Sequence, residues 1–334
     1  MVARVPFDTM VGEFKRVLLA SGFAERHAER CARLFAENTR DGVVSHGLNR
    51  FPGFAASCRR GSVDVGAEPC LRHQLGVVEQ WDGLNGIGLL NAERCMARAV
   101  AIAKESGMGC VGLRNTNHWM RAGAYGLQAA DAGCIGICWT NTTALMPAWG
   151  STQARVGNNP LAICVPYDDH HVLLDMAMSQ YSNGKLEVLK RSGEKLSIPG
   201  GYDRDGNLTT DPAAILESRR PLPVGCWKGS GLALMLDLMA TVVSGGDSTA
   251  TIARRPHETH VSQVFIGVDA TSLSGESFMR QTVDQVISNL KDSATADEAV
   301  EVRYPGEGML APRRENLMNG IKVDEELWQQ VLEM

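Results

Sequence analysis

A glycine pattern at residues 107–112 restricts the folds open to this chain, because it matches GxGxxG in a setting that a Rossmann fold does not use. The nucleotide-binding turn of that fold needs a strand before the glycines and a helix after them. Here residues 91–106 predict a helix that stops at Gly107, and residues 110–114 alternate as a strand does. The two elements come in the reverse order. The pattern therefore predicts a helix C-cap that leads into a strand, and it argues against a Rossmann fold.

The rest of the chain indicates a mixed α/β protein with more than one lobe. Its 334 residues exceed most single cores, and 44% hydrophobic with 21% charged residues is an ordinary globular balance. Two helices are expected near the start, the first capped by Asp8 or Thr9 and the second at 24–39. Residues 193–224, rich in Gly, Pro, Asp and Arg, predict a long ordered loop or arm. Further strands are expected at 76–82, 135–140, 161–166, 172–176 and 261–268, and further helices at 231–243 and 275–290.

Charge and cysteine usage exclude several classes of partner. The formal net charge is −5 and no dense Lys/Arg block occurs, so nucleic acid and anionic lipid are not expected as partners. The apolar stretch 231–243 contains Asp237 and is too short to span a bilayer. Nine cysteines form no CxxC pair, which favours free thiols in a reducing compartment, and the N-terminus lacks the apolar core of a signal peptide. These features predict a cytoplasmic protein that acts on small molecules.

Two histidine motifs predict an acid/base site. His46 lies in the run Ser45 to Arg50, and His118 lies three residues before Arg121. An imidazole titrates near neutral pH and can hand a proton to a developing alkoxide, while a guanidinium matches the shape of a carboxylate. We therefore expect a site for a small oxo acid or hydroxy acid. Arg121 is interpreted either as a solvated charge or as a second substrate clamp.

Other polar clusters leave alternatives open. The runs 168–171 and 257–260 contain histidine and acidic residues, but neither has HExxH spacing, so no metal is expected. A metal-dependent hydrolase is kept as a rival from another class, and a non-catalytic binding protein as a third. Residues 227–231, Trp-Lys-Gly-Ser-Gly, precede the helix predicted at 231–243 and indicate either a phosphate site or a flexible N-cap. They do not form a Walker A loop, because the lysine comes before the glycines.

Eight segments, taken together, resemble the type-2 malate/L-lactate dehydrogenase family of non-Rossmann NAD(P)-dependent oxidoreductases. The resemblance extends over essentially the whole chain and is densest within the family for members that reduce a diketo sugar acid. The segments are SHGLNRFPGF (45–54), VEQWDG (78–83), NHWMRAG (117–123), GICWTNT (136–142), GNNPL (157–161), LLDMAMSQYS (173–182), GNLTTDP (206–212) and CWKGSG (226–231).

The resemblance also implies roles for the two motifs. It implies that His46 donates a proton to the substrate carbonyl oxygen, with Ser45 and Arg50 positioning the substrate. Some relatives give the acid/base role to the histidine equivalent to His118. Those relatives have a lysine where this chain has residues 140–141, Thr-Asn. The absence of that ammonium group favours His46 as the acid.

The cofactor, fold and substrate implied by the resemblance complete the expectation. The cofactor is NAD as NADH, with NADP left open. The implied fold is α/β (α+β), with a helical substrate lobe from residues 1–75 and 275–334 and a cofactor lobe from 76–274 around a largely antiparallel sheet. Subunits are expected to form an intertwined homodimer. The substrate is a small keto acid, the alternative being another α-keto acid of lactate or malate type or a cyclic imino acid. The implied cofactor contacts are His171, Val172, Leu173, Leu174, Asp175, Met176, Ala177, Trp227, Lys228, Gly306, Glu307 and Gly308.

Overall fold

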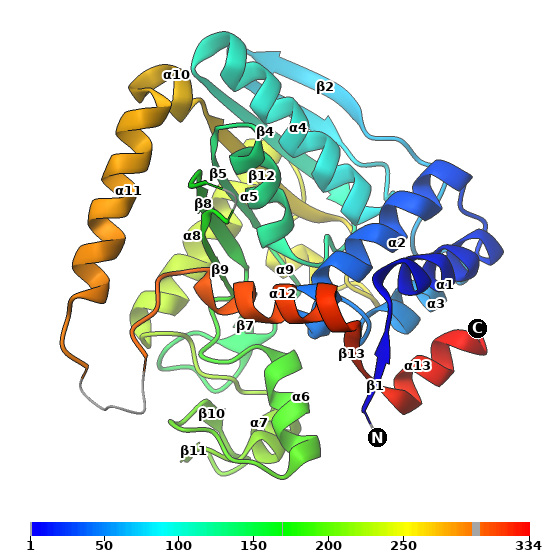
Figure 1. The fold of residues 1–334 in the computed structure, drawn as a ribbon. Helices are drawn as coiled ribbons and strands as arrows, with labels where there is room; N and C mark the ends of the chain where they lie inside the picture. Colours follow the sequence, from blue (N-terminus) through cyan, green and yellow to red (C-terminus); the bar gives the residue numbers. More distant parts are fainter. Residues whose placement is uncertain (1, 169, 296–300) are drawn as a thin grey trace.

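A seven-stranded sheet forms the centre of the larger lobe (Figure 1). The structure is a computed structural model and describes residues 2–168, 170–295 and 301–334. All neighbouring strands run antiparallel except β3 and β4, which are parallel. The predicted non-Rossmann fold with a largely antiparallel sheet is therefore confirmed. In sheet order the strands are β2 (Cys70–Leu75), β3 (Val78–Asp82), β4 (Met108–Thr116), β12 (Val261–Val268), β5 (Ile135–Thr140), β8 (Leu161–Val165) and β9 (Val172–Met176).

Helices cover both faces of this sheet. On one face α4 (Gly88–Ser106) and α5 (Ala122–Asp131) bury small and aromatic side chains, among them Tyr125, against the strands. On the other face α8 (Trp227–Ser244) packs through Ala233, Leu236 and Ala240. Sheets covered on both faces bury their strands on both sides. The core of this lobe is therefore divided into two layers, one on each side of the sheet.

The glycine pattern contributes to this packing. Gly107 ends α4 in the left-handed conformation with φ +83°, and β4 begins at the next residue, as the reversed order predicted. A side chain at Gly109 would collide with the carbonyl oxygen of Ala99 in α4. A Cβ at Gly112 would lie 2.7 Å from the carbonyl oxygen of Val243 in α8. The second and third glycines therefore let helices approach β4 from opposite faces.

A second lobe is built from both ends of the chain (Figure 1). Its N-terminal and C-terminal helices share one apolar core, in which Phe14, Phe35 and Phe51 form a ring cluster and Trp328 adds the C-terminal side. The predicted helical lobe from both chain ends is confirmed. Its elements are α1 (Phe7–Ala20), α2 (Glu25–Arg40), α3 (Phe51–Arg59), α12 (Leu310–Asn319), α13 (Glu325–Leu332) and the antiparallel pair β1 (Val2–Val5) and β13 (Ile321–Asp324).

The segment 193–224, predicted as a long ordered loop or arm, also contains a short helix and short strands that were not predicted. With α6 (Asn183–Ser192) it encloses a small core of Leu186, Leu189, Leu196 and Ile215. It contains the hairpin of β10 (Gly201–Tyr202) and β11 (Leu208–Thr209), followed by α7 (Pro212–Ser218). Each piece is too short for a periodic pattern to reveal it.

The remaining elements connect these parts. In Figure 1, α11 (Glu276–Lys291) stands on the far side of the sheet from α1 to α3, and none of its residues is buried. The residue boundaries expected for the two lobes stay a prediction. None of the helices in the described ranges combines the length and hydrophobicity that a membrane span requires. The other elements are η1 (Val44–His46), β6 (Met146–Pro147), β7 (Ala154–Val156), α9 (Thr249–Ile252), α10 (Ala270–Ser274) and η2 (Glu307–Met309).

Candidate active site between the two lobes

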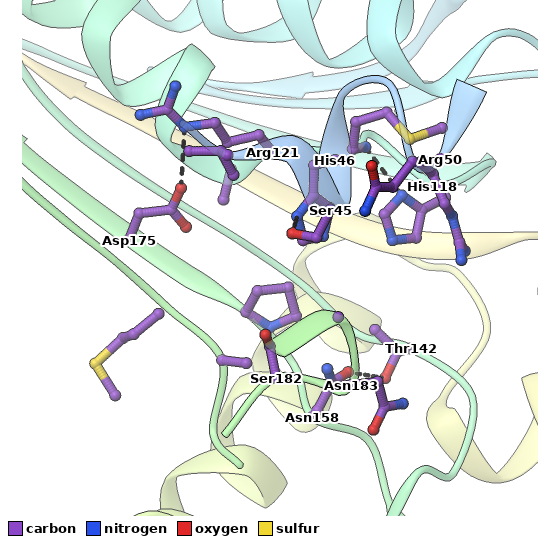
Figure 2. Close-up of a pocket in the computed structure, with 18 of the residues that line it drawn as sticks. Ser45, His46, Arg50, His118, Arg121, Thr142, Asn158, Asp175, Ser182 and Asn183 are labelled. Carbon is purple, nitrogen blue, oxygen red and sulfur yellow. Dashed lines mark hydrogen bonds and ion pairs between the residues drawn. The ribbon is translucent and has the colours of Figure 1, made fainter. Parts of the chain in front are cut away.

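A cavity of about 880 Å³ lies where the helical lobe meets one end of the sheet. Because β12 runs antiparallel to both β4 and β5, the ends of those two strands lie beside the start of β12. Loop residues that follow β4 and β5 and precede β12 therefore face one space, and His118, Thr142 and Glu258 all line it. The end of β9 adds Asp175, and the helical lobe adds His46 from above (Figure 2).

His46 is held in place by the end of α2. The Asn38 side chain donates to the carbonyl oxygen of His46 at 3.1 Å, and the Thr39 hydroxyl accepts the N–H of Leu48 at 3.0 Å. A hydrogen bond of 3.0 Å joins Ser45 Oγ and Nδ1 of His46. A hydroxyl can accept a hydrogen bond from Nδ1–H, so this contact is compatible with the cationic ring. No described residue bonds Nε2, which leaves that nitrogen available to a ligand in the cavity.

His118 is held in the opposite chemical state. The backbone N–H of Met120 donates to Nδ1 of His118 at 2.9 Å, so this nitrogen must be unprotonated and the ring proton resides on Nε2. Met120 adopts φ +65°, a conformation that L-residues rarely adopt and that recurs at functional sites. The rings of His46 and His118 are nearly parallel, at 14°, with centroids 5.9 Å apart. The cavity therefore presents two neighbouring imidazoles with different hydrogen-bonding capacity.

The pKa values of both histidines are lowered, that of His118 more than that of His46. Burial lowers the pKa of His118 well below its usual value of 6.5, and the charge of Arg50 and the neighbouring His46 add to the effect. Burial also lowers the pKa of His46, while the carboxylate of Asp175 opposes that shift. The charges of Arg50 and Arg121 favour the neutral form of His46 as well. Of the two rings, His46 is therefore the one with a carboxylate that supports its cationic form.

The two arginines of the motifs differ in their partners. Arg121 is almost fully buried and donates to Asp41 at 3.0 Å and to the sulfur of Met309 at 3.0 Å, and its Nε lies 3.5 Å from Asp175. The structure buries Arg121 as a tie between the lobes, so it is not a solvated charge; it also lines the cavity, and its role as a second substrate clamp stays a prediction. Arg50 also lines the cavity, and no described residue forms a hydrogen bond or an ion pair with its guanidinium. Arg50 is therefore a cation that stands beside the two histidines and is available to a ligand carboxylate.

The central anion of this tie is Asp41, at the end of α2. Arg313 donates to both of its oxygens, at 2.8 and 2.6 Å, and Arg40 donates at 2.9 Å. Burial opposes ionisation, but the hydrogen bonds from Arg313 and Arg40 and the charge of Arg121 lower the pKa of Asp41 to about 2. Asp41 therefore stays ionised at neutral pH and fixes Arg121 beside Asp175.

The residues expected to contact the cofactor fall into two groups. Some line the cavity together with the histidines: Leu173, Asp175, Met176, Ala177, Gly306 and Gly308. The others lie outside it: His171, Val172, Leu174, Trp227, Lys228 and Glu307. His171 instead bonds Asp131 at 3.0 Å, and Glu307 accepts from Lys291 at 2.6 Å. A main-chain hydrogen bond of 3.0 Å from Leu173 to Pro305 brings residues 306–308 against β9.

Residues 227–231 belong to α8, whereas the sequence predicted that they precede this helix. The helix already begins at Trp227, so Lys228 to Gly231 form its first turns and do not precede it. A side chain at Gly229 would collide with the carbonyl oxygen of Val224, which explains one small residue there by packing. Trp227 is 66% exposed and Lys228 is exposed. The alternatives of a phosphate site and an N-cap stay open for these residues.

Several cavity residues had no role in the sequence interpretation. Glu258 stands in the run 257–260, considered there only as a metal candidate. Asn158 belongs to the GNNPL segment, and α6 contributes Glu187 and Arg191. Of these four residues, only Asn158 lies in a segment that carried the family resemblance. Thr140 and Asn141 lie outside the cavity, and the Asn141 side chain joins β5 to α8 by donating to Asp237 at 2.8 Å.

Metal ligation finds no support in the described ranges. No group of three or more His, Cys, Asp or Glu side chains there is arranged to hold a metal ion. Residue 169, part of the run 168–171, lies outside the described residues.

Comparison with known proteins gives consistent matches over the whole chain. A family model described as malate/L-lactate dehydrogenase matches residues 5–332. The chain is 44% identical over 329 residues to the 2,3-diketo-L-gulonate reductase of Pasteurella multocida (strain Pm70), covering 98% of this chain and 99% of that protein. It is 42% identical over 326 residues to the enzyme of the same name from Haemophilus influenzae (strain ATCC 51907 / DSM 11121 / KW20 / Rd), covering 97% and 98%. The solved structure of malate dehydrogenase from Pyrococcus horikoshii OT3 superposes with a TM-score of 0.89 at 27% identity, covering 99% of this chain and 94% of that one.

Proposed function

The chain belongs to the malate/L-lactate dehydrogenase family of oxidoreductases that act on CH–OH groups, and we propose that it reduces 2,3-diketo-L-gulonate to 3-keto-L-gulonate with NADH. The relatives above support a keto acid as the substrate class. The observation that carries the proposal is the pairing of an unpartnered guanidinium, Arg50, with a proton donor, His46, on one cavity. A 2-oxo acid presents a carboxylate beside a ketone, which requires one group of each kind.

His46 is the proton donor in this proposal. The ketone oxygen gains negative charge as hydride arrives at its carbon, and Nε2–H of the His46 imidazolium neutralises that charge. The Ser45 hydroxyl accepts Nδ1–H and so fixes the ring's orientation. General acid catalysis of this kind is worth on the order of a hundred- to ten-thousandfold in rate.

His118 donates without transferring its proton. Nδ1 of His118 accepts the N–H of Met120, so the ring proton is on Nε2. This Nε2–H is a neutral hydrogen-bond donor on the cavity lining. A neutral imidazole can stabilise a developing oxyanion without losing its proton. His118 therefore orients the oxo acid and supports charge on the reacting oxygen, while His46 supplies the proton.

The family implies a nicotinamide cofactor, and the cavity suits one. One wall beside the histidines consists of Leu173, Asp175, Met176 and Ala177. The cavity is larger than a six-carbon acid alone would fill. When bound there, a reduced nicotinamide supplies the hydride. Gly306, with φ +93°, packs so closely on β9 that a Cβ would lie 3.0 Å from the nitrogen of Leu173. The main chain at 306–308 therefore closes this wall.

The assay that tests the proposal follows the absorbance of the reduced nicotinamide with purified protein and 2,3-diketo-L-gulonate. NADH and NADPH are run side by side, and we expect faster oxidation of NADH. If the diketo acid leaves both cofactors reduced, the substrate assignment is wrong. Pyruvate, oxaloacetate and cyclic imino acids then test the alternative of another family substrate.

A second copy of the chain is the partner we propose. One face of α8 carries large apolar side chains in the open, including Leu234, Met235, Leu238 and Val242. A contiguous apolar face of this kind marks a protein contact. The family resemblance implies a homodimer, and this face supplies a surface on which it can form.

A further inference from the structure

The cavity lining includes a carboxyl group, Glu258, that the proposed reaction does not use. Glu258 precedes β12, and its Oε2 accepts the backbone N–H of Thr143 at 3.0 Å. No described residue donates to its other oxygen, Oε1, and the side chain lines the cavity. Glu258 is half-buried, so this second oxygen is open to a ligand that enters the cavity.

Neighbouring side chains line the same cavity. Oγ1 of Thr142 lies 3.1 Å from the side-chain oxygen Oδ1 of Asn158 and can donate to it, which turns the side-chain nitrogen Nδ2 of Asn158 away from that contact. None of the described residues accepts from that nitrogen. Figure 2 shows Thr142 and Asn158 on the opposite side of the cavity from Arg50 and His118. Arg50 therefore lies on one side of the cavity and an acceptor and a donor on the opposite side, while Arg191 of α6 is a second cation on the lining.

This arrangement gives a bound sugar acid a direction. Arg50 and Glu258 interact electrostatically but form no ion pair, so neither neutralises the other at contact distance. A substrate carboxylate is attracted to Arg50. Burial raises the pKa of Glu258, against the hydrogen bond from Thr143 and the charge of Arg50, and its carboxyl group offers a substrate carboxylate no opposite charge. Hydroxyl groups, in contrast, donate readily to a carboxyl oxygen. The acid end of the molecule is thus directed to Arg50, and its hydroxyl-bearing end to Glu258.

We propose that Glu258 is a specificity-determining residue that accepts hydrogen bonds from the hydroxyl groups on the tail of a polyhydroxylated 2-oxo acid. This inference rests on the proposed function, because it assigns the tail of the same substrate. A site built to bind a substrate hydroxyl rejects an analogue that lacks it, since the protein group is then left unpaired. Glu258 therefore favours a sugar acid over short oxo acids such as pyruvate.

The test compares two substrates in three variants, with kcat and KM measured for each substrate and for NADH. Glu258→Ala removes the acceptor, Glu258→Gln keeps an acceptor for Thr143 without the charge, and Glu194→Gln makes the same change on the surface outside the cavity. We expect Glu258→Ala to lower kcat/KM for 2,3-diketo-L-gulonate on the order of ten- to a hundredfold, the loss of a charge-assisted hydrogen bond. Pyruvate turnover should change less than about threefold, Glu258→Gln should fall between, and Glu194→Gln should match the wild type.

The outcomes separate the two proposals. An equal loss with both substrates, no loss, or a change confined to the KM of NADH contradicts the role of Glu258 alone. A wild-type protein that does not turn over the diketo acid contradicts the proposed function and this inference with it. If Glu258→Ala does not fold, as judged by circular dichroism and thermal melting, the substrate selectivity of Glu258→Gln decides the question.

Discussion

The backbone N–H of Met120 donates to Nδ1 of His118. This relationship separates two histidines that the sequence leaves equivalent. An imidazolium carries a proton on both nitrogens, and a second proton on Nδ1 would face the Met120 N–H at hydrogen-bonding distance. His46, whose Nδ1 meets a hydroxyl, has no such conflict. In the proposed reaction, proton donation falls to His46 and neutral hydrogen bonding to His118.

Replacement of each histidine by glutamine should reveal this division. We expect His46→Gln to lower kcat on the order of a hundred- to ten-thousandfold while the KM of NADH changes less than about threefold. His118→Gln keeps a neutral donor, so its main effect should be a higher KM for the keto acid. Steady-state kinetics on both variants decide the matter. A larger kcat loss in His118→Gln than in His46→Gln would reverse the assignment.

The pH dependence of reduction should follow His46. The reaction needs the imidazolium, so kcat/KM is full below the pKa of His46 and is lost as the pH rises through it. Burial lowers this pKa below 6.5, and Asp175 opposes the shift. In Asp175→Asn that opposition is gone, so the falling limb should move to lower pH, whereas Asp284→Asn on α11 should leave it in place. A shift to higher pH would contradict the role given to Asp175.

Arg50 should govern affinity for the acid. A lysine keeps the charge but not the planar fork, so Arg50→Lys should raise the KM for the keto acid on the order of tenfold with a smaller effect on kcat. Arg59→Lys, an exposed change on α3, serves as the control. Unchanged affinity in Arg50→Lys would mean that another group binds the carboxylate.

Asp41 should dominate the acid stability of the contact between the lobes. Asp41→Asn removes the carboxylate that Arg121, Arg313 and Arg40 share, and we expect a loss of about 3 kcal/mol in the free energy of unfolding at pH 7. In the wild type, the pKa of about 2 lies below the unfolded value near 3.8, so ionised Asp41 contributes stability that is full above the unfolded value. That contribution, about 2 kcal/mol, is lost as the pH falls toward 2.

Urea unfolding at several pH values measures both effects. The control is Glu315→Gln, which breaks an exposed ion pair with Arg4 and should change the free energy of unfolding by less than about 1 kcal/mol. A stability curve for Asp41→Asn that falls as steeply below pH 4 as that of the wild type would show that other carboxylates control acid unfolding.

The exposed face of α8 should control the oligomeric state. Leu238→Glu places a charge among apolar neighbours, and we expect sedimentation velocity to show a monomer at concentrations where the wild type is a dimer. The same change at Leu75, on the edge strand β2, should leave the dimer intact. A wild-type protein that sediments as a monomer would contradict the proposed interface.

Local patterns in the sequence predicted much of the fold. The helix that ends at Gly107 and the strand that follows it were both read from periodicity and a stop signal, and α8 was predicted with its start four residues late. That error arose because glycines near a helix start look like a turn. The short elements within 193–224 gave no periodic signal, although Asp211 caps α7 by accepting the N–H of Ala213 at 2.9 Å.

The site was harder to predict, because its contacts join distant parts of the chain. The motifs identified His46, His118 and Arg50 as chemically useful, but nothing local indicates that the two rings are stacked. Arg121 had two interpretations, and its partner Asp41 is 80 residues away. Glu258 lies in the hydrophilic run 257–260, which the sequence suggested only as a candidate metal site. Long-range pairing by the sheet and the lobes decides these roles.

The pairing of β1 with β13 has a consequence for synthesis of the protein. The strand that completes the helical lobe, Ile321–Asp324, leaves the ribosome long after its partner Val2–Val5. Until then, the lobe that holds His46 lacks part of its core, including Trp328. A chain cut short before Ile321 lacks β13 and Trp328 and cannot complete the core of the lobe that holds His46. Activity should therefore appear only after Ile321–Asp324 and Trp328 have been synthesised.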